Sequence, residues 1–271
     1  MREVLYTIRG PKTMFEMTWE EVGEALKETD MAIVPLGATE QHGPHLPLGT
    51  DTMGVVEFAR RTATQLEEEG IKALVAPPVP FGISSYHMPF PGTISLHNTT
   101  WRKLVLDVLH SLYAHGFRRF VLPLGHGGNW AMMLVVSQQF MDETEDAKVL
   151  VLNWLPVLVA DYPEVFPTGK REGHSGAGET SRMLATHPEL VQLQRAQVYY
   201  PETMEEGEPP DHPLMGGGVL APKSSMKDAT PIGSVGDPNL ASAELGDRFY
   251  QKGVDWVCGQ IKKELGPFEA K

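Results

Sequence analysis

Cysteine is nearly absent from this 271-residue chain, which contains only Cys258. An intrachain disulfide is therefore excluded, and any metal site must use nitrogen and oxygen ligands, for which ten histidines and 35 acidic residues are available. Positive charge is also scarce. The formal net charge of −12 argues against a nucleic-acid-binding surface, which needs a basic footprint, and against docking on anionic membranes.

Long apolar runs are missing as well. No run reaches the roughly 18 residues of a membrane span, and the first residues, Met1–Tyr6, lack the apolar segment of a signal peptide. We therefore expect a cytoplasmic protein whose partner is a small-molecule substrate rather than nucleic acid or membrane. No internal repeat or linker divides the chain, so we expect one domain over residues 1–271.

Short apolar segments alternate with helical patterns along the chain. This alternation predicts an α/β fold with a mainly parallel sheet between helices. Residues 201–239 are dense in proline and glycine and are expected to form a long surface excursion. Strands are predicted at about 31–36, 72–77, 120–124 and 148–153, and helices at about 18–29, 52–69, 100–115, 129–142, 179–186 and 241–265.

The segment Gly37–Asp51 follows the first predicted strand and concentrates possible metal ligands. Glu40, His42 and Asp51 lie on a stretch whose glycines and prolines exclude a regular helix. Since α/β proteins bind ligands at the carboxyl ends of strands, these side chains are candidate ligands. The alternative is that Asp51 caps a helix beginning at Thr52 and that the others are polar loop residues. A fourth polar residue here, His45, is expected to support the loop.

A second motif, Gly125–Asn129, follows the third predicted strand and contains His126. Its glycines allow close backbone approach, so His126 should reach the same crevice. Alternatively, the turn binds an anion at a helix start, although it lacks the Walker lysine and the GxGxxG spacing. A third motif contains His174 and Glu179. We interpret Glu179 as a ligand and His174 as a general acid or base, against the alternative of a helix-end carboxylate and an exposed loop histidine.

Two further residues are candidates for substrate binding. His87 lies in the proline- and glycine-rich stretch 78–98, where it either lines a pocket or hydrogen-bonds within the loop. Trp154 follows the fourth predicted strand and is either a pocket wall or a core residue. A covalent nucleophile is not expected, because Ser175 and Ser181 lack the GxSxG context of a nucleophile elbow.

In combination, these motifs resemble the landmarks of the creatininase family of metal-dependent amidohydrolases. The resemblance rests on Glu40–Pro47, Asp51, Phe90–Thr93, Gly125–Asn129 and His174–Ser181, in that order. It implies a single α/β domain, a homo-oligomer that is usually a hexamer, and one or two divalent ions, variously Zn, Mn or Fe. The implied ligands are Glu40, His42, Asp51, His126 and Glu179, with Asp51 as a bridge if two ions are bound. The resemblance also implies His174 as proton donor and places Trp154 near a substrate-stacking tryptophan.

One position departs from creatininase itself, which has a glutamate where this chain has Gly128. The Gly-Gly-Asn form resembles other branches of the family, among them formamide deformylases, a peptidase of peptide-cofactor maturation and a hydrolase that opens a dehydro-inosose ring. We therefore expect a hydrolase that uses a metal-activated water to cleave a small cyclic amide or a formamide. The alternatives are ring opening of a cyclic polyol ketone, and a non-catalytic metal- or metabolite-binding protein on the same fold.

Overall fold

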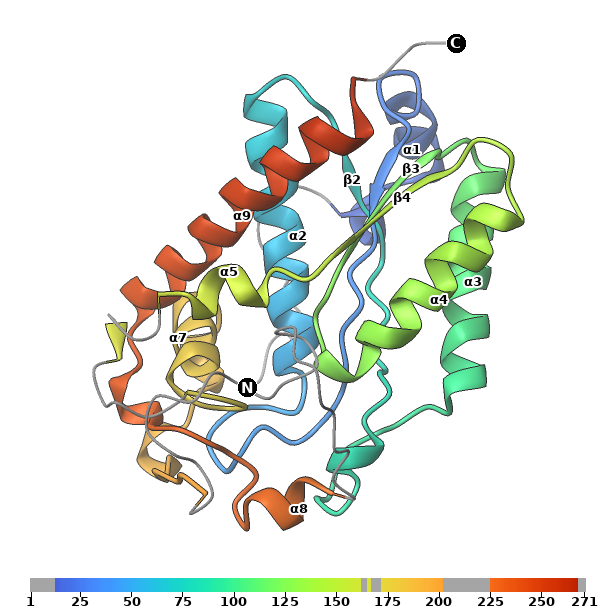
Figure 1. Cartoon of the computed structure of the whole chain (residues 1–271). Helices are drawn as coiled ribbons and strands as arrows, with labels where there is room; N and C mark the ends of the chain where they lie inside the picture. Colours follow the sequence, from blue (N-terminus) through green and yellow to red (C-terminus); the bar gives the residue numbers. More distant parts are fainter. Residues whose placement is uncertain (1–12, 162–164, 167–171, 202–224, 268–271) are drawn as a thin grey trace.

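A four-stranded parallel sheet lies at the centre of the molecule (Figure 1). The computed structural model describes residues 13–161, 165–166, 172–201 and 225–267. The strands follow the order β2-β1-β3-β4, and every neighbouring pair is parallel. They are β1 (Met31–Ile33), β2 (Leu74–Val75), β3 (Arg119–Pro123) and β4 (Lys148–Leu152). The parallel α/β architecture expected from the sequence is thus confirmed.

Helices connect the strands and follow the predicted pattern closely. The capping box that predicted the first helix is present, with Thr18 and Glu21 bonding reciprocally. The short helix α5 (Leu155–Val159), which follows β4, was not predicted. A second short helix, α8 (Met226–Ala229), lies within the 201–239 segment that was expected to be a loop. Residues 202–224 of that segment lie outside the described residues. The α-helices are α1 (Trp19–Ala25), α2 (Thr50–Glu68), α3 (Asn98–Ala114), α4 (Trp130–Asp142), α5 (Leu155–Val159), α7 (Ala177–Thr186), α8 (Met226–Ala229) and α9 (Ala243–Leu265).

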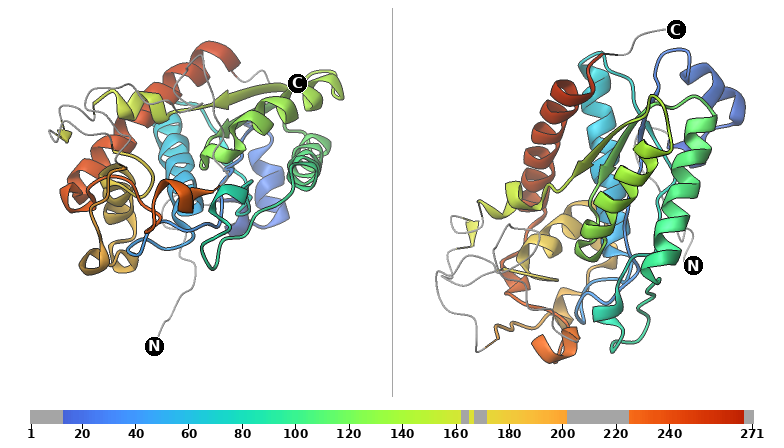
Figure 2. Two further views of the ribbon diagram at one scale, coloured as in Figure 1. Left: turned by 60° about the horizontal axis from the view of Figure 1, so that its bottom comes forward. Right: turned by 45° about the vertical axis from the view of Figure 1, so that its right-hand side comes forward.

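Helices cover both faces of the sheet. Successive strand residues point to opposite faces, so neighbouring residues of one strand pack against different helices. Ala32, Phe120 and Leu122 pack in one hydrophobic cluster with α3 and α4. Ile33 and Val121 pack in the other cluster with α2 and α9. The two helical layers lie on either side of the sheet in Figures 1 and 2. Strands buried on both faces are near-continuous apolar runs, and β1 is buried throughout.

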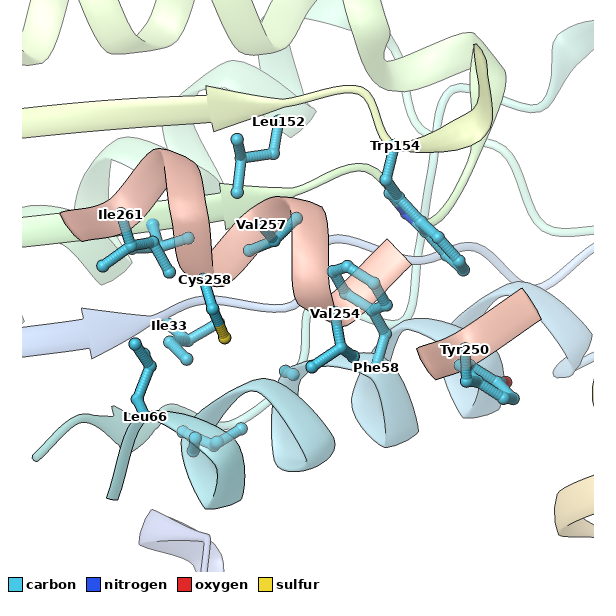
Figure 3. Packing of buried hydrophobic residues seen from close by; sticks show 14 of the residues in the cluster. Ile33, Phe58, Leu66, Leu152, Trp154, Tyr250, Val254, Val257, Cys258 and Ile261 are labelled. Atoms are coloured by element: carbon cyan, nitrogen blue, oxygen red, sulfur yellow. The ribbon is translucent and has the colours of Figure 1, made fainter. Parts of the chain in front are cut away.

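The layer of α2 and α9 also contains the single cysteine (Figure 3). Val254, Val257 and Ile261 of α9 pack in one cluster with Phe58 of α2. Cys258 is buried in the same cluster, where burial raises the pKa of its thiol to about 12. A thiol that stays protonated is a poor nucleophile, as expected for a core residue.

No helix among the described residues is long and apolar enough to cross a membrane.

The chain segments that follow β1, β2 and β3 stay together beyond the sheet. Leu36 forms parallel bridges with both Val79 and Leu124. Gly125 N then donates to Leu36 O at 3.0 Å. A Cβ at position 125 would lie 2.6 Å from that oxygen, so glycine permits this close approach. The motifs at 37–51 and 125–129 therefore leave the sheet side by side, at the end that comes forward in the left view of Figure 2.

Candidate metal centre

The first loop buries three acid and imidazole groups beside the N-terminus of α2. Glu40 is 1% exposed and His42 is fully buried. Asp51 lies in the first turn of α2, whose N-cap is Gly49, so the alternative that Asp51 caps a helix starting at Thr52 is wrong. Being inside the helix, Asp51 projects its carboxylate from a rigid element.

His42 is oriented by the backbone of its own loop. Its Nδ1 donates to the carbonyl oxygen of Glu40 at 3.1 Å. This bond leaves Nε2 facing two carboxylates, at 3.2 Å from Asp51 Oδ1 and 3.7 Å from Glu179 Oε2. A histidine whose second nitrogen is fixed by a hydrogen bond is the usual arrangement of a metal ligand.

His126 is oriented in the same way from the end of β3. Its Nε2 donates to the carbonyl oxygen of Ile83 at 3.1 Å. Its Nδ1 then lies 3.2 Å from Glu40 Oε2 and 3.2 Å from Asp51 Oδ2. Gly128 makes this packing possible, because a Cβ there would lie 2.3 Å from the Ile83 oxygen.

The third motif contributes Glu179 and His174 from the start of α7. Glu179 Oε2 accepts a hydrogen bond of 2.7 Å from Ser175 N and lies 4.0 Å from His174 Nδ1. His174 is not an exposed loop residue, because its side chain is only 19% exposed. Its Nε2 lies 2.9 Å from the carbonyl oxygen of Gln41 and 3.1 Å from Gln41 Nε2. In the tautomer that donates to the carbonyl oxygen, the Nδ1 lone pair is free.

Three overlapping groups of these side chains could each hold an ion, since their ligand atoms lie within 4.8 Å of one another: Glu40, Asp51 and His126; His42, Asp51 and Glu179; and Glu40, His42 and His174. The first two groups share Asp51. Glu40 Oε2 and Asp51 Oδ2 are buried and have no hydrogen-bond partner of good geometry, and each lies 3.2 Å from His126 Nδ1. Buried carboxylate oxygens are costly unless they are paired or coordinate a cation. The donor set therefore fits divalent metal binding.

The carboxylates and imidazoles of the centre shift each other's pKa in opposite directions. Burial alone would lower the pKa of His42, but the charge and hydrogen bond of Asp51 outweigh it and raise that pKa to about 10. Burial likewise opposes the rise for His126, whose pKa lies well above its usual value because of Glu40 and Asp51. Although burial favours their neutral forms, the pKa values of Glu40 and Asp51 are lowered by these imidazoles. The carboxylates are therefore ionised at neutral pH and available as ligands.

His87 also lies at this centre, and sequence reasoning missed its neighbour Gln41. His87 Nε2 is 3.3 Å from Glu40 Oε1. Gln41 Nε2 donates to His87 Nδ1 at 2.9 Å, which places the proton of a neutral His87 on Nε2, facing Glu40. Burial and the charge of His174 lower the pKa of His87 to about 3. The sequence feature that could have identified Gln41 is its position between two candidate ligands, Glu40 and His42.

The other two residues considered from the sequence have packing roles. His45 Nε2 hydrogen-bonds with Thr180 Oγ1 at 3.0 Å, which agrees with its predicted role in supporting the loop. Trp154 is not the pocket wall that the sequence suggested. It is 3% exposed, stacks on Phe58 with ring centroids 4.1 Å apart, and donates from Nε1 to Leu124 O at 2.7 Å. This tryptophan fills the core because its ring covers α2 just beyond β4.

Comparison with known proteins places this geometry in a family. The creatininase family model, described as creatinine amidohydrolase, matches residues 15–261. Mycofactocin precursor peptide peptidase of Mycobacterium ulcerans is 34% identical, covering 85% of this chain and 84% of its own length. Creatinine amidohydrolase of Pseudomonas putida is 31% identical, covering 93% and 96%. The 3-dehydro-scyllo-inosose hydrolase of Thermotoga maritima is 28% identical, covering 94% and 84%.

Solved structures agree with the sequence relatives. The crystal structure of a creatinine amidohydrolase (creatininase) has a TM-score of 0.78 at 28% identity, covering 94% of this chain and 98% of that one. A mutant creatininase described as the Zn-Zn type has a TM-score of 0.77 at 29% identity, covering 94% and 100%. The three relatives are named as a peptidase, an amidohydrolase and a hydrolase, and this chain belongs to the creatininase family of hydrolases.

Proposed function

We propose that this chain is a metal-dependent hydrolase that cleaves the C–N bond of a small cyclic amide or a formamide with an activated water molecule. The observation that carries the proposal is Asp51. Its carboxylate is shared by two groups of candidate ligands and has one buried oxygen without a hydrogen-bond partner. The family match supports the reaction class, because the relatives are hydrolases.

The residues divide into two sets around the shared carboxylate. Glu40, Asp51 and His126 would hold one divalent ion, and His42, Asp51 and Glu179 would hold a second. Zn, Mn and Fe all accept such mixed nitrogen and oxygen ligands. When bound, the ion supplies Lewis acidity, which polarises a carbonyl group and lowers the pKa of a water molecule.

His174 is the residue that moves protons in this proposal. Burial and the charge of His42 lower the pKa of His174, so its imidazole is neutral near pH 7. Because Nε2 donates to Gln41 O, the lone pair is on Nδ1. His174 Nδ1 can therefore accept a proton from the attacking water and deliver it to the leaving nitrogen.

The surroundings of Gly128 count against creatinine as the substrate. Creatininase has a glutamate at the matching position, whereas a Cβ here would meet the carbonyl oxygen of Ile83 at 2.3 Å and His126 Nε2 at 2.5 Å. The backbone of this chain thus excludes a carboxylate side chain there.

The second candidate is ring opening of a cyclic ketone, which the inosose hydrolase relative supports at 94% coverage of this chain. A non-catalytic binding protein is less favoured, because it would have no need for a positioned His174.

The test is a metal-replete activity screen against cyclic amides, formamides, peptide amides and inosose-type ketones. The chain is stripped with a chelator, reloaded with Zn, Mn or Fe, and assayed beside Glu40→Gln and His42→Ala. Turnover should require metal and fall by orders of magnitude in both variants. A folded double variant that keeps full activity would contradict the proposal, and turnover of ketones but not amides would favour the second candidate.

A further inference from the structure

An apolar pocket of about 290 Å³ opens beside the candidate metal centre. The described residues that line it carry no ionisable side chain, and Gln41 and Gln197 are its two polar side chains. Its apolar wall comes from two separate segments of the 41–91 region and from the segment before α9. The lining residues are Gln41, Gly43, Pro44, Leu48, Phe90, Pro91, Gln197, Pro231 and Ile232.

Gln41 connects this pocket to the catalytic residues. It stands between Glu40 and His42 in the sequence, and its carbonyl oxygen accepts the Nε2 proton of His174. One wall of the pocket is therefore the residue that fixes the proposed proton donor. The pocket therefore lies next to a residue that orients His174.

The position of Gln41 is fixed from both sides. Its Oε1 accepts a hydrogen bond of 3.0 Å from Gly43 N. Gly233, with φ at +77°, lies so close that a Cβ there would be 1.9 Å from the same oxygen. The segment containing Pro231 and Ile232 is thus pressed against Gln41, and the pocket is preformed by backbone contacts.

We propose that this pocket binds an uncharged, apolar substituent on the leaving nitrogen of the substrate. This inference rests on the proposed function, because it assigns His174 to the leaving group. A space of this size holds an aliphatic or aromatic group of side-chain size, and a charged group would find no charged partner among the described lining residues. The preferred substrate is therefore an N-alkyl or N-aralkyl amide rather than an unsubstituted one.

Binding of reverse hydroxamates tests the pocket without requiring turnover. N-Hydroxyformamides chelate a divalent ion through two oxygens and carry their substituent on nitrogen. On Zn-loaded protein, affinity should rise about three- to fourfold for each methylene added from N-methyl to N-butyl. C-alkyl hydroxamates, which carry the same groups on carbon, should gain much less. Equal gains in both series, or none in the N-series, would overturn the proposal.

Variants assign the gain to the pocket itself. Ile232→Asp should abolish the chain-length dependence of the N-series while leaving the affinity for the N-methyl compound nearly unchanged. Ile232→Ala, a milder change, should reduce the gain if the aspartate variant does not fold. Leu134→Asp is the matched control, because Leu134 is 47% exposed on α4 and does not line the pocket. An unchanged series in both Ile232 variants would refute the assignment. If the compounds bind as expected but no amide is hydrolysed, the proposed function fails while the pocket stands.

Discussion

Gly128→Ala should destabilise the chain and weaken metal binding together. A Cβ at this position would lie 2.3 Å from the carbonyl oxygen of Ile83 and 2.5 Å from His126 Nε2. Neither atom can yield easily, because one belongs to the backbone and the two are joined by a 3.1 Å hydrogen bond. Overpacking costs about 1–3 kcal/mol. Loss of the hydrogen bond adds about 0.5–1.5 kcal/mol. The expected decrease in unfolding free energy is therefore about 1.5–4.5 kcal/mol.

Urea unfolding of the metal-free chain measures this loss, and competition with a chromogenic chelator measures the metal affinity. The hydrogen bond that breaks also orients His126, and removing such a partner typically weakens metal affinity about 10- to 100-fold. Gly259→Ala is the matched control. Gly259 lies inside α9 with nothing within 4 Å of a Cβ, so alanine should stabilise by about 0.5–1 kcal/mol and leave metal binding unchanged.

Gly128→Ala with stability within 0.5 kcal/mol of the parent (about the usual range of a harmless surface change) would refute this reasoning. So would a loss of stability without any loss of metal affinity. In the first case Gly128 would have no packing constraint. In the second case the contact between Ile83 and His126 would have no part in orienting the ligand.

Three other predictions follow from the contacts of the centre. In the metal-free chain the pKa of His42 is raised from 6.5 to about 10, so its imidazole is protonated at neutral pH. The stability that the protonated imidazole contributes is lost as the pH rises from about 6.5 to 10. Metal uptake near pH 7 should release protons and tighten as the pH rises, which calorimetry in buffers of different ionisation enthalpy can measure. His87→Gln should weaken metal affinity by about 10-fold or more with little change in stability, because His87 orients Glu40; equal affinity would contradict that role. Trp154→Ala should lower the unfolding free energy by about 3–5 kcal/mol, whereas a pocket wall would change the KM and leave stability intact.

Local sequence patterns predicted most of the fold. The capping box at Thr18 marked the first helix, and apolar runs marked all four strands, because a parallel sheet buries both of its faces. Strands β1, β2 and β4 are shorter than the runs that predicted them, and β3 has the predicted length but begins one residue earlier. Beyond Ile33 the chain continues through Pro35, which has no N–H to donate, and it pairs with its neighbours only by single bridges at Leu36.

The sequence indicated which residues form the candidate centre but not which of them contact one another. Glycine-flanked histidines and carboxylates at strand ends have a local signature, so Glu40, His126 and Glu179 could be named from the sequence. The contact of His87 with Glu40 joins residues 47 positions apart by number and has no such signature. The two alternatives for Trp154 could not be separated from the sequence, because whether a tryptophan after a strand faces a pocket or the core depends on the packing of the helices.

Asp51 provides the most direct test of the central claim that a shared carboxylate holds the metal on which hydrolysis depends. Metal content and turnover are measured on the same samples of the parent and of Asp51→Asn, which keeps the shape of the side chain and removes its charge. We predict that the variant retains the parent's circular dichroism spectrum but loses bound metal and hydrolysis together. A variant that binds metal and turns over substrate like the parent would contradict the account.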